Sequence, residues 1–367
     1  MSPAQTKQPE REQLARAQRI VLKIGSRSLL ADDDRFALMA RVIHGLKSRG
    51  REVLLVSSGA VAAGRKRLGI TERPKRLALL QAVAAAGQSA LMWSYEQAFA
   101  PYGMRAAQIL LTHADLADRD RYLNARNALT ALLDLGVVPI INENDTVSVH
   151  ELKFGDNDQL AALVAALVDA DLLVLLTDVE GVLDSDNRRI SFVENPDKLA
   201  SLIRPPTDDV GLGGMGSKVD AAKRALAHGI PVIIGDARRE DLLERILDGE
   251  DEGTLFWPSG ESLRTKKHWI AYTLKPKGTI FIDDGAARAL LEDGASLLPG
   301  GILGVRGNFQ EGEAIAIVDP AQREIARGLA RIGAPEVAKV AGTRAKDGVP
   351  QAARVVVHRD DLVLLPR

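Results

Sequence analysis

The chain has 367 residues, 46% hydrophobic and 26% charged, which is typical of globular proteins and long enough for two domains. Its 48 basic and 49 acidic residues give a formal net charge of −1, which offers no electrostatic signal for nucleic acid or anionic membranes. The lack of cysteine excludes disulfides, thiolate metal sites and cysteine nucleophiles.

Residues 1–18 are polar and charged, and we interpret them as a flexible N-terminal tail. They lack the apolar core of a signal peptide. We also expect no stretch to supply the roughly 20 apolar residues of a membrane span. The sequence therefore predicts a cytoplasmic protein that does not enter a membrane.

Residues 19–255 alternate short β-branched runs with helical patterns and are expected to form one α/β domain. Strands are predicted at 19–25, 52–59, 136–145, 171–178 and 230–236. Runs that are apolar on both faces suit the centre of a parallel sheet covered by helices. Ligands of such sheets bind at the carboxyl ends of the strands, so the polar residues that end these runs are the first candidates for chemistry.

The C-terminal part has a different pattern, with short strands, frequent glycine turns and one short helix at 286–293. We expect a compact β-rich domain at 277–356. Residues 256–276, which contain two prolines, are predicted to link the two domains.

Lys23 interrupts the first apolar strand and is followed by Gly25, Ser26 and Ser28. A lysine in such a strand is poorly placed unless it meets an anion. A phosphate would suit it, because small residues let backbone amides approach oxygen while the ammonium group supplies charge. The alternative is an edge strand whose lysine reaches solvent, and this strand alone leaves both interpretations open.

Two later strands also end in polar residues. Ser58 stands at the end of 52–59, before a helix-favouring run, where backbone amides can face an anion or a polar substrate. The alternative is a plain turn, since serine and glycine end many strands. In INENDTVS (141–148), Asn142 and Asp145 can offer donors and acceptors to a small polar ligand. An Asx turn or a helix cap is the alternative for that run.

Two predicted helices begin with polar residues. Asp156, Asn157 and Asp158 precede an Ala/Leu run, and one of them is expected to cap the helix, which leaves others for a ligand or for orienting lysines. The stretch GLGGMGSK (211–218) combines flexible backbone with Lys218 at a helix start, a position suited to phosphate. Its Gly-Ser-Lys order and late place in the domain exclude a P-loop.

Seven stretches in this order resemble the amino-acid kinase family and, within it, the glutamate 5-kinases. They are VLKIGS, SSGAVAAG, LLTHADLADRDRYLNARNAL, VPIINENDTV, KFGDNDQLAALVAALV, LLTDVEGVL and GLGGMGSK. The segment 277–356 is similar to the PUA domain attached to many bacterial members. The resemblance implies an amino-acid kinase sandwich with a mainly parallel central sheet. It also implies ATP-dependent phosphorylation of the L-glutamate side-chain carboxylate, the first step of proline biosynthesis from glutamate.

The resemblance further implies a role for each matching residue. Catalysis would fall to Lys23, Lys218 and Asp158, with Asp158 positioning the two lysines. Glutamate would be held by Ser58, Asn142, Asp145 and Asn157. ATP would be contacted by Lys23, Thr177, Asp178, Leu212, Gly213, Gly214, Met215, Gly216, Ser217 and Lys218. Mg²⁺ would arrive with ATP and take no ligand directly from the protein.

The family pattern carries expectations about partners as well. It implies inhibition by proline at or near the glutamate site, a homo-oligomer (tetramer or dimer), and transient hand-over of the product to a glutamyl-phosphate reductase. Leu212 and Gly216 depart from the family loop, which usually has threonine and a hydroxyl residue at these two places.

Three alternatives stay open. The substrate could be another carboxylate such as N-acetylglutamate, although Asp145 suits the ammonium group of free glutamate. The PUA domain could bind RNA, but residues 277–356 hold ten basic and ten acidic side chains, a balance that argues against strong backbone binding. The C-terminal domain could instead be structural, bridging subunits or tuning regulation.

Overall fold

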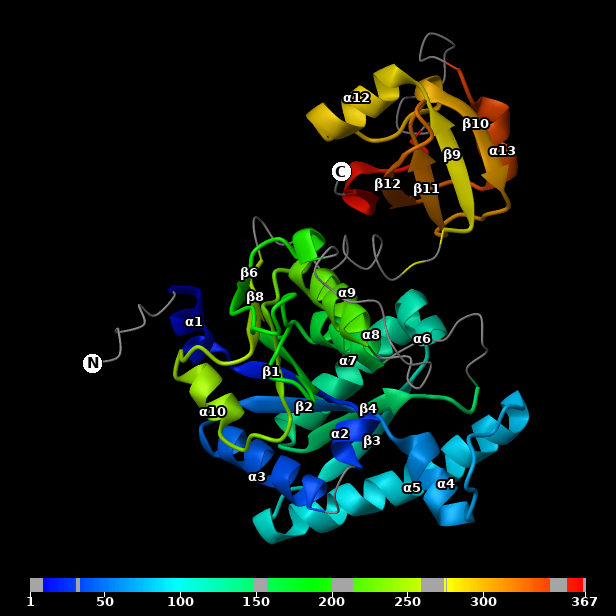
Figure 1. The fold of residues 1–367 in the computed structure, drawn as a ribbon. Coiled ribbons are helices and arrows are strands. Elements are labelled where there is room, and N and C mark those ends of the chain that lie inside the picture. The colour runs from blue at the N-terminus through cyan, green and yellow to red at the C-terminus, as the bar shows by residue number, and fades with distance from the viewer. Residues whose placement is uncertain are drawn as a thin grey trace. The chain divides into compact units, whose positions relative to one another are not determined.

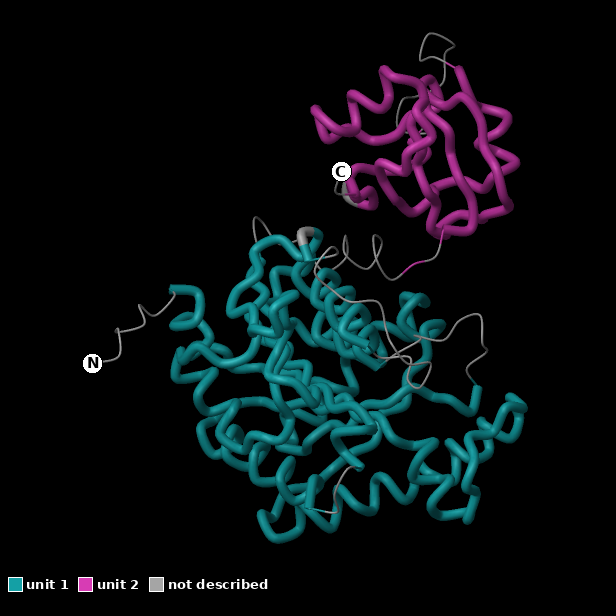
Figure 2. Tube along the Cα trace, viewed as in Figure 1, with its two compact units in different colours: residues 1–262 teal, residues 263–367 magenta. Residues whose placement is uncertain are grey.

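The computed structural model describes residues 9–30, 34–147, 157–199, 214–258, 274, 276–343 and 355–365. The chain divides into two compact units, Met1–Ser262 and Leu263–Arg367 (Figure 2).

Eight strands in the described part of the first unit form one sheet, in the order β3-β4-β2-β1-β5-β7-β8-β6 (Figure 1). Their bounds are β1 Arg19–Ile24, β2 Glu52–Ser57, β3 Ala106–Leu111, β4 Val138–Glu143, β5 Leu172–Thr177, β6 Phe192–Val193, β7 Val232–Asp236 and β8 Thr254–Phe256. All neighbours from β3 to β7 are parallel, and β8 runs antiparallel to β7. The predicted α/β class with a mainly parallel central sheet is therefore confirmed.

Helices cover both faces of this sheet (Figure 1). Those described in the first unit are α1 Pro9–Gln13, η1 Leu14–Arg16, α2 Ser26–Leu29, α3 Arg35–Ser48, α4 Ala60–Leu68, α5 Leu77–Phe99, η2 Ala100–Tyr102, α6 His113–Ala117, α7 Arg119–Asp134, α8 Asn157–Leu167, η4 Pro196–Leu199, α9 Met215–Leu226 and α10 Leu242–Leu247. Ile20, Leu22 and Ile24 of β1 join a core with α3 and α5. Because side chains alternate along a strand, Val21 and Lys23 point to the opposite face, where α8 packs.

The five predicted strands form close to their expected bounds, whereas β3, β6 and β8 were not predicted. β3 (AAQILL) contains alanine and glutamine and has no buried run on both faces, so its local pattern is weak. Strand β6 has two residues and β8 has three, too few for a period to show.

Helices α4 and α5 cross at unusually short range. A Cβ atom on Gly64 would overlap the carbonyl oxygen of Val83, and one on Gly87 would overlap that of Ala60. Each glycine therefore lets one helix backbone rest on the other. The crossing fixes the position of α4, which begins directly beyond the end of β2.

Helix α5 bears on the expectation that no stretch could span a membrane. By length and composition alone, Leu77–Tyr102 could cross one, since this alanine- and leucine-rich stretch carries few charges. In the structure, Leu91, Tyr95 and Phe99 of this helix are buried in the core shared with β1 and α3. Helix α5 therefore has the length and composition of a membrane span, but its residues Leu91, Tyr95 and Phe99 pack in the core of the α/β unit.

The N-terminal residues differ from the predicted flexible tail where the structure describes them. Residues 9–16 form α1 and η1, and Arg11 is only 1% exposed. The Arg11 guanidinium donates to the carbonyl oxygens of Ser191 (2.7 Å) and Glu252 (2.8 Å) and lies 2.9 Å from Asp251 Oδ1. This segment is thus fastened to the β6–β8 edge by contacts more than 170 residues away in sequence, which no local pattern reveals.

The described part of the second unit contains a five-stranded sheet in the order β10-β9-β11-β12-β13. Its elements are β9 Gly278–Ile282, α12 Asp284–Asp293, η6 Pro299–Gly301, β10 Ile302–Gly307, β11 Ala314–Val318, β12 Glu324–Leu329, α13 Ala334–Val340, η9 Arg359–Asp361 and β13 Leu362–Leu364. Asp283 caps α12 by accepting a hydrogen bond from the amide of Ala286. The predicted small β-rich domain and its short helix are both present.

Candidate active site

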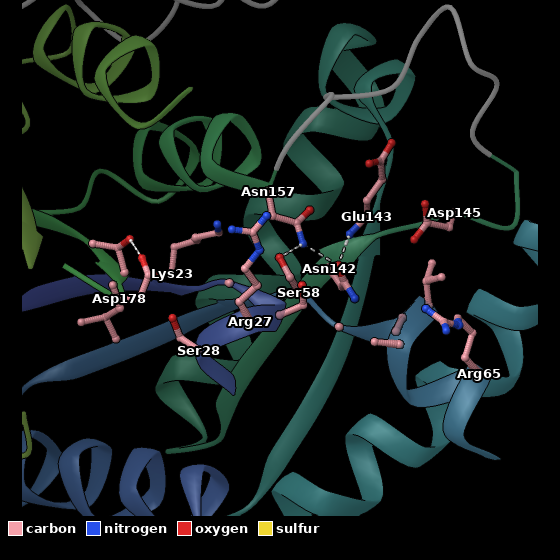
Figure 3. A pocket seen from close by; sticks show the side chains of 18 of the residues that line it. Lys23, Arg27, Ser28, Ser58, Arg65, Asn142, Glu143, Asp145, Asn157 and Asp178 are labelled. Atoms are coloured by element: carbon pink, nitrogen blue, oxygen red, sulfur yellow. Dashed lines mark hydrogen bonds between the residues drawn. The ribbon is translucent and has the colours of Figure 1, made fainter. Parts of the chain in front are cut away.

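The carboxyl ends of β1, β2, β4 and β5 open into a cavity of about 340 Å³ (Figure 3). Its basic lining residues are Lys23, Arg27, Arg65, Arg73 and Lys218, and its acidic ones are Glu143, Asp145 and Asp178. The excess of basic side chains favours an anionic ligand.

Lys23 is the fifth of the six residues of β1, which lies between β2 and β5. The side chain is 3% exposed. The alternative of an edge-strand lysine in solvent is therefore wrong. Because Lys23 points to the face covered by α8, it meets the first turn of that helix.

Asp158 joins Lys23 to Lys218. Its Oδ1 lies 2.6 Å from Lys23 Nζ and its Oδ2 lies 3.0 Å from Lys218 Nζ. Asp158 stands in the first turn of α8 and is fully buried, and Lys218 stands in the first turn of α9 and is 6% exposed. One carboxylate thus holds two ammonium groups at the cavity wall, and the three groups together carry a net charge of +1.

Asn157 organises the other half of the cavity. Its Nδ2 donates to Ser58 Oγ (2.9 Å), to the carbonyl oxygen of Ser57 (3.1 Å) and to Asn142 Oδ1 (2.8 Å). The amide of Glu143 also donates to Asn142 Oδ1, at 2.9 Å. Since both partners of that oxygen are donors, the Asn142 amide can have only this orientation.

Asn142 Nδ2 is therefore a fixed donor. Asn142 is 4% exposed, and its Nδ2 finds no acceptor among the described residues. A buried donor without an acceptor is costly, so a bound oxygen at this point would stabilise the site. A carboxylate of a small ligand meets that requirement.

Ser57, the last residue of β2, supports the half of the cavity that Asn157 organises. Its hydroxyl lies 2.8 Å from the hydroxyl of Tyr95, a fully buried residue of α5. Burial raises the pKa of Tyr95 well above its usual range, although the hydrogen bond with Ser57 acts in the opposite direction. The phenol therefore stays protonated, and the pair holds the end of β2 in place.

The opposite end of the cavity is formed by β5. Thr177 ends that strand and donates through Oγ1 to Asp178 Oδ1 at 3.1 Å. Figure 3 shows Asp178 on one side of Lys23, and Ser58, Asn142 and Asp145 on the other. The cavity thus has two ends, with the lysine between them.

Most of the predicted site residues come together here. Lys23, Ser58, Asn142, Asp145, Asn157, Thr177, Asp178 and Lys218 line the cavity, and Asp158 lies directly behind it. Of the described loop residues Gly214 to Lys218, only Lys218 lines it. Leu212, Gly213 and Asp156 fall outside the described residues. The roles assigned to all these residues stay predictions.

Four further charged residues line the cavity for which the sequence predicted no role: Arg27, Arg65, Arg73 and Glu143. Arg65 could have been found, because it lies three and four residues after Ala62 and Val61, which puts all three on one face of α4. Arg27 follows β1 within one turn and therefore reaches the same sheet edge as Lys23. Arg73 lies between α4 and α5, outside any helix or strand, so no hydrophobic periodicity indicates which way it points.

The fold and the cavity define an α/β protein whose site, at the carboxyl edge of the parallel sheet, favours an anionic ligand. Comparison with known proteins makes this specific. The amino acid kinase family matches residues 18–236, and the PUA domain matches residues 278–348.

Two curated relatives match almost the whole chain. The glutamate 5-kinase of Pelobacter propionicus is 45% identical over 376 residues, which cover 97% of this chain and 100% of that protein. The glutamate 5-kinase of Citrifermentans bemidjiense is 45% identical over 372 residues, with the same coverage. A solved carbamate kinase from Giardia is 18% identical and covers 66% of this chain and 99% of its own, with a TM-score of 0.49. The family match and the two curated relatives show that the chain belongs to the amino acid kinase family and, within it, to the glutamate 5-kinases.

Proposed function

We propose that this chain transfers the γ-phosphoryl group of ATP to the side-chain carboxylate of L-glutamate, giving L-glutamyl 5-phosphate and ADP. The relatives named glutamate 5-kinase support this substrate, since their matches cover 97% of the chain. In that role the chain catalyses the first step of proline biosynthesis from glutamate.

The observation that carries the proposal is the pairing of Lys23 and Lys218 through Asp158 at the cavity wall. The attacking carboxylate has a pKa near 4.3 in water, so it is ionised at neutral pH and needs no general base. The obstacle is its repulsion from the phosphates of ATP. Phosphoryl transfer is catalysed mainly by positioning and positive charge, which two fixed ammonium groups supply.

The amino-acid substrate fits the end of the cavity built by Asn157, Ser58 and Asn142. Asn142 Nδ2 donates to a glutamate carboxylate, and Ser58 Oγ offers a second polar contact. Asp145, half-buried at the same end, accepts from the substrate ammonium group. This ammonium contact favours free glutamate over N-acetylglutamate, whose nitrogen carries no charge.

ATP then occupies the end formed by Thr177 and Asp178, with its γ-phosphate toward Lys23 and Lys218. The glycine-rich loop from Leu212 to Lys218 is proposed to complete this nucleotide site. Among the described residues no group of three or more His, Asp or Glu side chains could hold a metal ion. Mg²⁺ is proposed to arrive with ATP, bound to its phosphates, where it would neutralise phosphate charge.

Proline is proposed as a feedback inhibitor at or near the glutamate end, and the active form as a homo-oligomer, dimer or tetramer. The product is an acyl phosphate that water cleaves readily, so a transient hand-over to a glutamyl-phosphate reductase would protect it. We place these reactions in the cytoplasm.

The second unit is proposed to be structural or regulatory. Its cavity of about 390 Å³ is lined mainly by small and apolar residues of α12 and of 295–301, and Asp283 is the one charged residue among the described residues that line it. RNA binding needs cations that neutralise phosphates. That lining does not favour RNA.

The test is to incubate the purified chain with Mg-ATP, L-glutamate and hydroxylamine, which traps an acyl phosphate as a hydroxamate. We expect γ-glutamyl hydroxamate and ADP in equal amounts, and no product from N-acetylglutamate or aspartate in parallel reactions. Product from N-acetylglutamate alone would keep the mechanism and refute the substrate. No product from any of the three acids, in folded chain that binds ATP, would refute the proposed function.

A further inference from the structure

Arg27 occupies a central place in the cavity that the mechanism above does not use. It lies on α2, which follows β1 after Gly25, and its exposed side chain lines the cavity. Figure 3 shows its guanidinium rising toward the end of Lys23 and toward Asn157. In this view it stands between the Asp178 end and the Asn142 end, where a phosphoryl group must pass from donor to acceptor.

The charge of the site indicates why a cation at this position would assist the reaction. Lys23 and Lys218 share Asp158, so the three groups carry a net charge of +1. The reaction brings a carboxylate against a phosphoryl group that is itself anionic, which calls for further positive charge on the acceptor side. A guanidinium is always protonated, and its planar fork can bind two oxygens at once.

We propose that Arg27 is a further catalytic residue, whose guanidinium binds non-bridging oxygens of the transferring phosphoryl group from the side of the amino acid. This inference rests on the proposed function. As the glutamate oxygen forms its bond to the γ-phosphorus, the bond from that phosphorus to the bridging oxygen breaks. The electron pair stays on ADP, and no proton has to move. Arg27 thus balances charge that develops only while the group is in transit.

The role predicts a specific kinetic change. In Arg27→Gln we expect kcat to fall about 100-fold, the usual loss for one oxyanion donor. The KM for glutamate and the dissociation constant of ATP should stay within about threefold, because the contact is made in the transition state. Arg27→Lys keeps the charge without the fork, and its kcat should lie between those of the unsubstituted chain and Arg27→Gln.

Arg67→Gln is the matched control, since it removes the same charge from an exposed residue of α4 that does not line the cavity. Its kcat should stay within about twofold of that of the unsubstituted chain, because salt screens the interaction between an exposed charge and a distant site. Thermal unfolding of each variant separates lost structure from lost catalysis.

The possible outcomes distinguish failure of the Arg27 role from failure of the proposed function. Undiminished turnover in Arg27→Gln, with hydroxamate formed by the unsubstituted chain, would overturn the role of Arg27 alone. A loss confined to the KM for glutamate would also overturn it, because Arg27 would then hold the bound substrate and not the phosphoryl group in transit. No hydroxamate from the unsubstituted chain would overturn the proposed function and this inference with it.

Discussion

Asp158 shows what one side chain contributes at the residue scale. It is fully buried and contacts both lysines, so its carboxylate sets the distance between two groups that would otherwise repel. We infer that Asp158 is a positioning residue that acts through Lys23 and Lys218.

Asp158→Asn tests this role, because the substitution keeps the shape and removes the charge. The asparagine amide can accept from one lysine, but its NH₂ group meets the other donor to donor. We expect kcat to fall about 100-fold, since small misplacements at a reacting centre cost that much. ATP binding should be kept or tightened, because the cluster changes from +1 to +2.

Steady-state kinetics with a separate ATP-binding measurement checks this prediction. Weaker ATP binding with unchanged kcat would contradict it and make Asp158 a nucleotide ligand. Asn142 is the second residue-scale case. Two donors, from Glu143 and Asn157, fix its Oδ1, which leaves its Nδ2 without an acceptor among the residues that the structure describes.

At the scale of elements, the crossing of α4 and α5 positions part of the cavity. Helix α4 presents Val61, Ala62 and Arg65 to the site, and its backbone rests on α5 at Gly64 and Gly87. Any side chain at the crossing must push the helices apart, which moves that wall of the cavity.

Gly87→Ala should therefore lower the free energy of unfolding by about 1–3 kcal/mol through overpacking. It should also raise the KM for glutamate as α4 shifts. Gly45→Ala in α3 is the control, because its added Cβ meets nothing within 4 Å. That substitution should be neutral or stabilise the chain by about 0.4–1 kcal/mol. Equal stability of the two variants would contradict the close crossing.

At the scale of the whole molecule, the N-terminal segment is held to the far edge of the sheet by Arg11 and Asp251. Burial lowers the pKa of Arg11, and the charge of Asp251 opposes that shift. For Asp251, burial raises the pKa, but hydrogen bonds from Arg189 and Ser191 and the charge of Arg11 outweigh it, so the pKa is lowered overall.

A lowered pKa in the folded state means that the ionised carboxylate stabilises the fold above its unfolded pKa of about 3.9. This stability is lost as the pH falls through the lower folded pKa. Asp251→Asn should therefore destabilise the first unit by about 1–3 kcal/mol at neutral pH, since it weakens hydrogen bonds to charged groups. The difference from the unsubstituted chain should hold down to about pH 5 and shrink below about pH 4.

Calorimetry across this pH range measures the difference. The exposed Asp134 supplies the control, because Asp134→Asn should change stability by no more than about 0.5 kcal/mol at any pH. A difference for Asp251→Asn that grows as the solution is acidified would contradict the assigned sign.

Local sequence patterns were enough to predict the family, the α/β class, the five strands that are apolar on both faces and the polar residues that end them. Those features are local, because a strand or a helix start is written in a few consecutive residues. The resemblance to the family implied that Asp158 positions Lys23 and Lys218, and the structure shows both contacts. Only the tertiary structure shows that Arg27 and Arg65 reach the same cavity and that Arg11 is buried. These contacts join residues far apart in the chain. Their partners are chosen by how the sheet and helices pack, which no short window of sequence contains.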